Sequence, residues 1–216
     1  MTRALLIVGF GGHGRVVADV ALDCGYDTIA FLDDGRDALS QSTPFPVLGP
    51  TREMSAQVKR WSSAIVAIGN GPRRLALFGD LKRARYATPT IAHPSAIVSR
   101  GAIIGEGVFI APGAIVNAGA RIGNAAIINT GARIDHDCEV GAGTHIASGA
   151  TLSGGVSVGR ASWIGAGSTV RQGVCIGDNV MIGLGAAVVT DIPSAGVYVG
   201  VPARAIDTRT REDHLA

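Results

Sequence analysis

The chain has 216 residues, of which 17% are charged, and a formal net charge of +2. This length predicts one large or two modest domains, and a nearly balanced charge without a basic run argues against nucleic-acid binding. Only a short apolar run (residues 4–8) precedes the first glycine cluster, which is too short for a signal peptide or a membrane span. We therefore expect a cytoplasmic protein without membrane insertion. The three cysteines lie far apart and form no CxxC pair, which predicts reduced thiols.

The first ninety residues alternate apolar runs with helical patterns. Apolar runs at residues 4–8, 28–32 and 64–68 predict strands, and helices are expected from the 9–14 loop to Gly25, near residues 51–60, and from Gly71 to Arg85. Alternating strands and helices predict an α/β domain (residues 1–90) with a small parallel sheet, a Rossmann-like half, covered by helices.

The loop GFGGHG after the first strand satisfies the pattern G-x-G-x-x-G. The backbone amides of such a loop and of the following helix bind phosphate, so Gly11, Gly12, His13 and Gly14 are candidate ligand-binding residues. The alternative is that these glycines only make a tight turn between strand and helix.

An acidic pair, Asp33 and Asp34, follows the loop by about twenty residues, where a ribose-binding carboxylate belongs. The loop and the acidic pair alone suggest NAD. The second half of a dinucleotide fold is missing, however, so a mononucleotide or a nucleotide sugar fits better. The acidic pair also reads as a solvated turn. Arg73 and Arg74 at the start of the third helix either contact a second phosphate or form an exposed basic face.

A period of six organises residues 98–188. Every sixth residue from Val98 to Val188 is Val, Ile or Leu, and the residue three positions later is Gly at eleven of these sixteen sites. Six is a poor helical period, but it suits a short strand with an inward aliphatic followed by a turn that needs a positive φ. Hexapeptide repeats of this kind predict a parallel β-helix, here over residues 91–207, with a tail at 208–216.

Two histidines stand out within the repeats. His136 is expected at a corner, next to Asp137, which occupies a position usually held by glycine; Asp137 is either a turn residue or a partner of the imidazole. His145 follows nine residues later, half of an eighteen-residue coil, so the two imidazoles should lie on opposite sides of one prism. If both are functional, they meet between subunits, as in a ring of three prisms. His93 reads as structural, and Trp163 either lines the same cleft or packs at an interface.

The chain resembles the bacterial hexapeptide-repeat sugar acetyltransferases, in particular the nucleotide-linked 4-amino-sugar N-acetyltransferases and the sialic acid O-acetyltransferase relatives. The resemblance covers nearly the whole chain. It rests on six motifs: GFGGHG, FLDD at 31–34, AIGNG at 67–71, HPSA at 93–96, INT…DHD through His136, and VGVPAR at 199–204.

This resemblance implies a left-handed β-helix and a homotrimer that binds acetyl-CoA between neighbouring prisms, with the nucleotide sugar held by the N-terminal domain. It implies that His136 is the general base supported by Asp137, and that His145 contacts the acetyl carbonyl. The implied sugar and nucleotide contacts include Asn129 near the sugar and the AIGNG residues Gly69 and Asn70. The implied acetyl-CoA contacts are Gly154, Gly165, Ala166 and Gly183, and no metal is implied.

Three alternatives remain open at this stage. An O-acetyltransferase acting on sialic acid or a related sugar would use the same residues. A non-catalytic sugar-nucleotide-binding protein would keep the fold but tolerate loss of the histidines. A β-helical carbonic anhydrase needs three metal-binding histidines, whereas the repeats hold two. The nucleotide (UDP, GDP or dTDP) and the sugar are not determined by the sequence.

Overall fold

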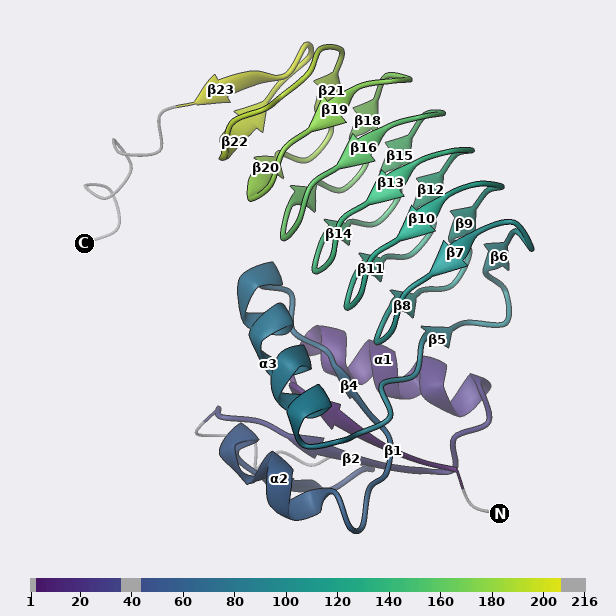
Figure 1. Ribbon diagram of the computed structural model, residues 1–216, viewed down its shortest axis with the longest axis vertical. Helices are drawn as coiled ribbons and strands as arrows, with labels where there is room; N and C mark the ends of the chain where they lie inside the picture. Colours follow the sequence, from purple (N-terminus) through teal and green to yellow (C-terminus); the bar gives the residue numbers. More distant parts are fainter. Residues whose placement is uncertain (1–2, 36–43, 207–216) are drawn as a thin grey trace.

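The computed structural model describes residues 3–35 and 44–206. A small α/β domain formed by the N-terminal part of the chain packs against the lower coils of a long prism of stacked strands (Figure 1). The prism begins at residue 91, next to the boundary expected at residue 90. The expected tail at 208–216 lies outside the described residues.

The N-terminal domain contains a parallel sheet of order β3-β2-β1-β4. Its strands are β1 (Ala4–Val8), β2 (Thr28–Leu32), β3 (Val47–Gly49) and β4 (Ala64–Val66). Its helices are α1 (Gly12–Asp23), the 3-10 helix η2 (Thr51–Glu53), α2 (Met54–Gln57) and α3 (Gly71–Arg83). The helix expected near residues 51–60 is therefore shorter and ends at Gln57. Strand β3, which is only three residues long, was not expected from the sequence.

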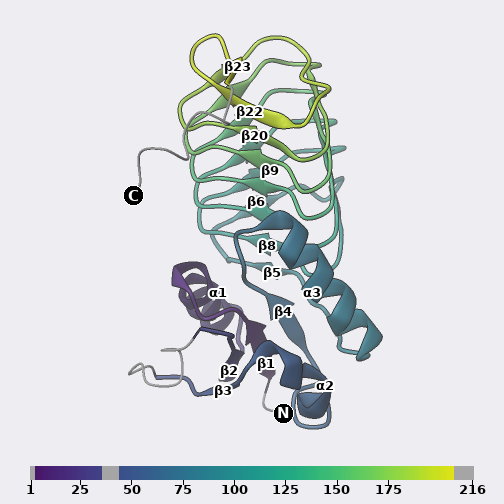
Figure 2. The ribbon, with the colours of Figure 1, turned by 90° about the vertical axis from the view of Figure 1, so that its left-hand side faces the viewer.

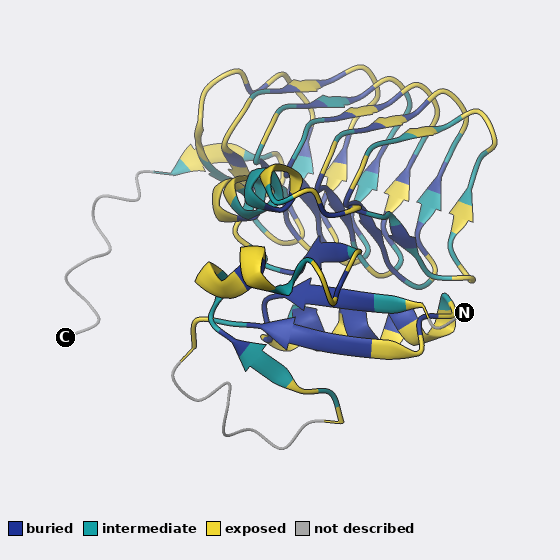
Figure 3. Ribbon diagram, turned by 60° about the horizontal axis from the view of Figure 1, so that its bottom comes forward, coloured by how far each residue is buried: buried dark blue, intermediate teal, exposed yellow. Residues whose placement is uncertain are grey.

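Both faces of this sheet are covered, which explains its continuous apolar runs. Alternate residues of β1 point to opposite sides. Leu5 and Ile7 pack with α1, whereas Leu6 and Val8 pack with residues of α2 and α3 such as Met54. Strands β1, β2 and β4 are consequently buried along almost their whole length, whereas the edge strand β3 is half-buried (Figure 3).

The prism is a left-handed parallel β-helix with three walls. The eight-stranded wall contains β5 (Ile91–Ala92), β8 (Phe109–Ile110), β11 (Ile127–Ile128), β14 (His145–Ile146), β17 (Trp163–Ile164), β20 (Val180–Ile182), β22 (Gly196–Val199) and β23 (Arg204–Ile206). The six-stranded wall contains β6 (Ile97–Val98), β9 (Ile115–Val116), β12 (Arg133–Ile134), β15 (Thr151–Leu152), β18 (Thr169–Val170) and β21 (Ala187–Val188). The five-stranded wall contains β7 (Ile103–Ile104), β10 (Arg121–Ile122), β13 (Glu139–Val140), β16 (Ser157–Val158) and β19 (Cys175–Ile176).

The six-residue period sets both the core and the turns. Fourteen of the sixteen aliphatic positions are buried in one continuous cluster, and the other two, Val98 and Ile104, pack against its open end. Each buried aliphatic contributes about 1.5–3 kcal/mol. Fourteen of the sixteen turn positions three residues later have positive φ, including four that are not glycine: Ala125, Asp137, Ala161 and Asn179, with φ of 53° to 58°. The repeat therefore dictates the turn conformation, and glycine is only its least strained occupant.

The two domains share a continuous apolar interface. Outward residues of the lower eight-stranded wall, Ile91, Phe109 and Ile127, belong to the same buried cluster as Val17 of α1. Helix α3 lies along one edge of the prism, against the turns of successive coils (Figure 2). No helix in the described ranges 3–35 and 44–206 has the length and apolar character needed to cross a membrane.

Candidate active site

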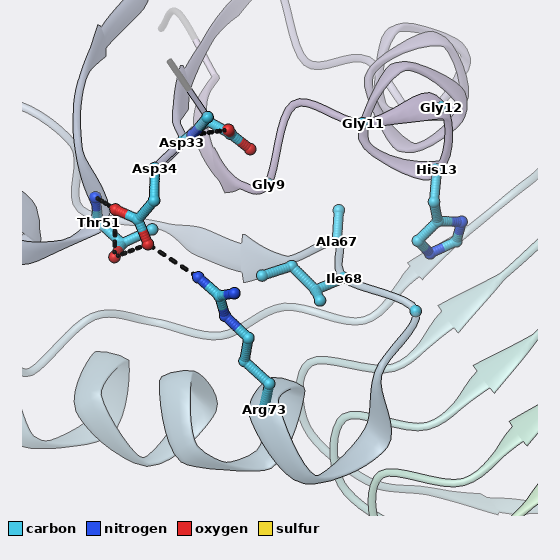
Figure 4. Close-up of a pocket in the computed structure, with 12 residues that line it drawn as sticks. Gly9, Gly11, Gly12, His13, Asp33, Asp34, Thr51, Ala67, Ile68 and Arg73 are labelled. Carbon is cyan, nitrogen blue, oxygen red and sulfur yellow. Dashed lines mark hydrogen bonds and ion pairs between the residues drawn. The ribbon is translucent and has the colours of Figure 1, made fainter. Parts of the chain in front are cut away.

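A cavity of about 580 Å³ opens where three strands of the N-terminal sheet end (Figure 4). The residues after β1, β2 and β4 line it, as expected for a ligand site at the carboxyl edge of a parallel sheet. Its lining residues are Gly9, Gly11, Gly12, His13, Asp33, Asp34, Gly35, Thr51, Ala67, Ile68, Gly69 and Arg73.

The glycine loop brings bare backbone to this cavity. Gly9 has φ of +113°, and a Cβ on Gly14 would overlap the carbonyl oxygen of Gly9, so both positions require glycine. A Cβ placed on Gly11 or Gly12 would have no other atom within 4 Å, so the backbone there borders open space. No side chain caps the N-terminus of α1. The first amides of a helix have no intrahelical acceptor, so this end of α1 can bind an anion.

The acidic pair is held by hydrogen bonds. Asp33 accepts hydrogen bonds from the backbone amides of Phe10 and Gly35, each at 2.7 Å. Asp34 accepts hydrogen bonds from the amide and hydroxyl of Thr51 at 2.8–2.9 Å and from Arg73 at 2.9 Å. Desolvation raises the pKa of Asp34, but the Thr51 hydrogen bonds and the Arg73 guanidinium outweigh it, so the pKa lies below its usual value. Thr51 carried no recognisable signal in the sequence.

Two imidazoles lie at the junction of the domains. His13 points away from the acidic pair (Figure 4), and its ring centroid is 6.2 Å from that of His145 on β14 and 5.2 Å from that of Phe109. Desolvation, and then the Arg74 charge, lowers the pKa of His13 to about 4 and that of His145 to about 3. Both rings are therefore neutral at pH 7. Trp163, on the neighbouring strand β17, packs on His145 at a centroid distance of 4.1 Å.

The tautomer of His145 follows from its neighbours. The backbone amide of Thr130 donates to Oδ1 of Asn129 at 2.8 Å, which turns Nδ2 of Asn129 toward Nε2 of His145 at 3.1 Å. Since Nε2 accepts this hydrogen bond, the neutral ring carries its proton on Nδ1. Nδ1 is buried and has no hydrogen-bond partner among the described residues. His145 thus holds a buried N–H for which the described residues offer no acceptor.

Arg74 does not lie on an exposed basic face, which excludes that one of the two alternatives for this residue. Its side chain is fully buried, and its guanidinium donates to four backbone carbonyls. Arg73, one residue earlier, is exposed and pairs with Asp34 across the cavity. Asn70 caps the N-terminus of α3, because its side-chain oxygen Oδ1 accepts a hydrogen bond from the backbone amide of Arg73 at 2.9 Å.

His136 lies at the corner between β12 and β13. Its Nδ1 is 2.9 Å from Oδ2 of Asp137, and 64% of its side chain is exposed. Its backbone amide donates a hydrogen bond to Oδ1 of Asp135. The same oxygen accepts a second hydrogen bond from Nδ2 of Asn117 at 3.0 Å. The hydrogen bond that the ring donates to Asp137, followed by the charge of Asp135, raises the pKa of His136 above its ordinary value. Asp137 has φ of +58°, so it is a turn residue and an imidazole partner at once. Asp135 was not among the expected site residues.

Within one chain His136 and His145 are on opposite sides of the prism, as their spacing predicts. His136 lies where the six-stranded and five-stranded walls meet, and β14 belongs to the third wall. Gly165, Ala166 and Gly183 line an apolar hollow of about 460 Å³ with Trp163 and Leu184. Gly154 lies elsewhere, against the ring of His136. Among the described residues no group of His, Cys, Asp and Glu is arranged to hold a metal ion.

Comparisons with known proteins agree with this two-part architecture. The family described as the PglD N-terminal domain matches residues 4–81, and the bacterial transferase hexapeptide family (six repeats) matches residues 119–154. A nucleotide-sized cavity on the first part and a histidine–carboxylate corner on the second define a hexapeptide-repeat acyltransferase.

Solved structures extend the likeness to the whole chain. The acetyltransferase domain of PglB from Neisseria gonorrhoeae, solved alone and with acetyl coenzyme A, is 38% identical, with a TM-score of 0.90 over 95% of this chain and 100% of that chain. PerB from Caulobacter crescentus, solved with CoA and GDP-perosamine, is 37% identical, with a TM-score of 0.89 over 94% of this chain and 97% of that chain. The chain belongs to this family of hexapeptide-repeat sugar N-acetyltransferases.

A curated relative gives a shorter match. The UDP-N-acetylbacillosamine N-acetyltransferase of Bacillus subtilis is 38% identical over 113 residues, which are 50% of this chain and 51% of that protein. The match thus spans about half the length of the curated relative.

Proposed function

We propose that the protein transfers the acetyl group of acetyl-CoA to the amino group of a nucleotide-linked 4-amino sugar, in bacterial surface-glycan biosynthesis. The C–N bond forms as the thioester C–S bond breaks, in a complex that holds both substrates. The proton lost by the amine passes to His136 and from there to the departing sulfur, which leaves as the CoA thiol. Since acetyl-CoA and nucleotide sugars are made in the cytoplasm, we place the reaction there.

The nucleotide is assigned to the cavity of the N-terminal domain. The uncapped N-terminus of α1 and the exposed backbone of Gly11 and Gly12 suit a diphosphate. Arg73 adds a positive charge at the opposite rim, and Asp33 and Asp34 carry the acceptors that a ribose or a base needs. Neutral His13, Gly14, Gly69 and Asn70 complete the proposed substrate contacts, with Asn129 near the sugar.

His136 is assigned as the general base. A sugar ammonium must lose a proton before its nitrogen can attack a carbonyl, and an imidazole can take it near neutral pH. The hydrogen bond that Nδ1–H donates to Asp137 strengthens this basicity and fixes the ring, and it leaves Nε2 for the substrate.

His145 is assigned to the acetyl carbonyl. Its neutral ring packs on Trp163, which lines the same apolar hollow as Gly165 and Ala166. A neutral N–H that reaches the carbonyl would stabilise a developing oxyanion. Because His136 and His145 occupy opposite sides of one prism, one chain cannot bring both to a thioester. We therefore propose a homotrimer whose sites lie between subunits, with Gly154, Gly165, Ala166 and Gly183 along the CoA arm.

The observation that carries the proposal is the pairing of exposed His136 with Asp137 on a chain that also holds a nucleotide-sized cavity. To test it, the protein is incubated with acetyl-CoA and a panel of UDP-, GDP- and dTDP-linked 4-amino sugars, and thiol release is followed. We expect release with at least one 4-amino sugar and none with the matching 4-hydroxy sugar. Reaction with free sialic acids alone would replace the N-acetyl assignment by O-acetylation.

A further inference from the structure

Arg74 is a buried cation without a carboxylate partner among the described residues. Its guanidinium donates to the carbonyl oxygens of Ile68 at 2.6 Å, Gly69 at 2.8 Å, Ala125 at 2.7 Å and Gly143 at 2.5 Å. Burial lowers its pKa to about 10, so it remains charged at neutral pH. An isolated buried charge is costly, and four carbonyl dipoles offset part of that cost. This free-energy cost of burying the guanidinium indicates that Arg74 has a role beyond packing.

The first effect of Arg74 falls on the 68–70 loop at the edge of the nucleotide cavity. In a trans peptide the N–H points away from the preceding C=O. With the carbonyls of Ile68 and Gly69 bound to the guanidinium, the amides of Gly69 and Asn70 are turned away from it. Ile68, Gly69 and Arg73 line the cavity; Asn70 is an exposed residue between them at its edge, and Arg74 does not line it. Neither amide donates a hydrogen bond to another described residue, so both remain free for a ligand.

The second effect of Arg74 is to tie that loop to the β-helix. Ala125 and Gly143 occupy equivalent turns of successive coils, and both carbonyls are bound by the one guanidinium. The N-terminus of α3 approaches the same edge so closely that a Cβ on Gly71 would lie 2.7 Å from the carbonyl oxygen of Gly143. One planar side chain therefore ties the 68–70 loop to two successive coils, in addition to the apolar contacts between the domains.

We propose that Arg74 is a positioning residue for nucleotide-sugar recognition. It holds the 68–70 loop so that the amides of Gly69 and Asn70 bind the anionic or carbonyl oxygens of the nucleotide, and it keeps that loop in register with the coils. This inference rests on the proposed function, because it assigns a cause for substrate affinity at the same cavity.

Arg74→Lys tests the guanidinium. An ammonium keeps the charge but cannot span four carbonyls on two domains. We expect the KM for the nucleotide sugar to rise at least tenfold, while the KM for acetyl-CoA stays within twofold and kcat at saturation within about threefold. The matched control is Tyr86→Phe, which removes a buried hydrogen bond to the Met54 carbonyl in the same domain. It should lower the melting temperature without changing either KM.

A second pair of variants tests the amides without touching Arg74. Asn70 has φ of −64°, which suits proline, so Asn70→Pro removes the amide hydrogen and the helix cap, whereas Asn70→Ala removes the cap alone. We expect the KM for the nucleotide sugar to be at least fivefold higher in Asn70→Pro than in Asn70→Ala. The same comparison can be made on the binding of the free nucleoside diphosphate by calorimetry.

The outcomes separate this inference from the proposed function. If the wild-type chain neither binds a nucleoside diphosphate nor acetylates any amino sugar, the proposed function fails. Suppose instead that the wild-type chain is active. If the KM for the nucleotide sugar is then the same in Arg74→Lys as in Tyr86→Phe, and the same in Asn70→Pro as in Asn70→Ala, the role of Arg74 is refuted. Should Arg74→Lys not fold, the Asn70 pair decides.

Discussion

The ring of His136 lies directly against the backbone of Gly154, one coil further along the prism. A Cβ on Gly154 would come within 2.5 Å of Nε2 of His136, and no other side chain could stand there without moving the ring. Two features thus set the orientation of the His136 ring: its hydrogen bond to the Asp137 carboxylate, and the space left at Gly154 by the absence of a side chain.

Gly154→Ala should therefore disturb catalysis by displacing the ring of the proposed base. We expect kcat to fall at least tenfold with little change in the KM for the nucleotide sugar, because the ring is pushed from its position while the nucleotide cavity is untouched. Steady-state kinetics measure both. Gly101→Ala is the control, since its Cβ would meet nothing closer than 3.7 Å. Equal kcat in the two variants would show that the position of the ring does not matter.

His136→Asn should remove the base while leaving the fold intact, because the side chain is largely exposed. A general base contributes about 10²–10⁴-fold, so kcat should fall by that factor with a smaller change in KM. The melting temperature is the control for folding. A variant with near-normal kcat would exclude His136 as the base.

Asp137→Asn should shift the pH dependence of the reaction. The Asp137 hydrogen bond raises the pKa of His136, so its loss lowers that pKa. The acidic limb of the kcat/KM profile then moves to lower pH, and kcat falls because the imidazole is a weaker base. Asparagine tolerates the positive φ of this turn, so the backbone should persist. Asp135→Asn, whose charge is the second cause, should shift the limb less; a profile unmoved by either substitution would contradict this account.

The buried imidazoles should make the protein acid-sensitive. The pKa values of His145 and His13, about 3 and about 4, lie below the unfolded value of 6.5, so below that pH the unfolded chain binds more protons. Their contribution to stability is complete above about pH 6.5 and is lost as the pH falls toward 4 and then 3. Urea unfolding at pH 7.5 and 4.5 measures this slope.

Variants assign the acid sensitivity to these rings. His145→Gln should flatten the decline in the free energy of unfolding between pH 6.5 and 4.5. His136→Asn should not flatten it, because the pKa of His136 is shifted in the opposite direction. If both variants decline as steeply as the wild type, the acid sensitivity arises elsewhere.

The exposed pair of Arg73 and Asp34 should matter for ligand binding more than for stability. Both side chains are about half exposed, and such pairs contribute at most about 1 kcal/mol. Arg73→Ala should leave the melting temperature nearly unchanged and raise the KM for the nucleotide sugar severalfold. A large loss of stability with unchanged KM would reverse these roles.

The sequence alone determined the repeat domain and its turns. Each coil places the same inward position every six residues, so a local pattern was sufficient to predict the walls, the buried aliphatics and the corner that holds His136 and Asp137. The first, second and fourth strands of the N-terminal sheet, and its glycine loop, were likewise visible, because buried parallel strands are continuous apolar runs.

Only the tertiary structure decided what happens between the domains. No local pattern separates buried Arg74 from exposed Arg73, and their difference depends on how α3 docks against turns some 50 and 70 residues away, where Arg74 binds Ala125 and Gly143. The meeting of His13 with His145, and the lowered pKa of both, depend on the same docking. Such contacts arise from packing between distant segments, which the periodicity of either segment does not encode.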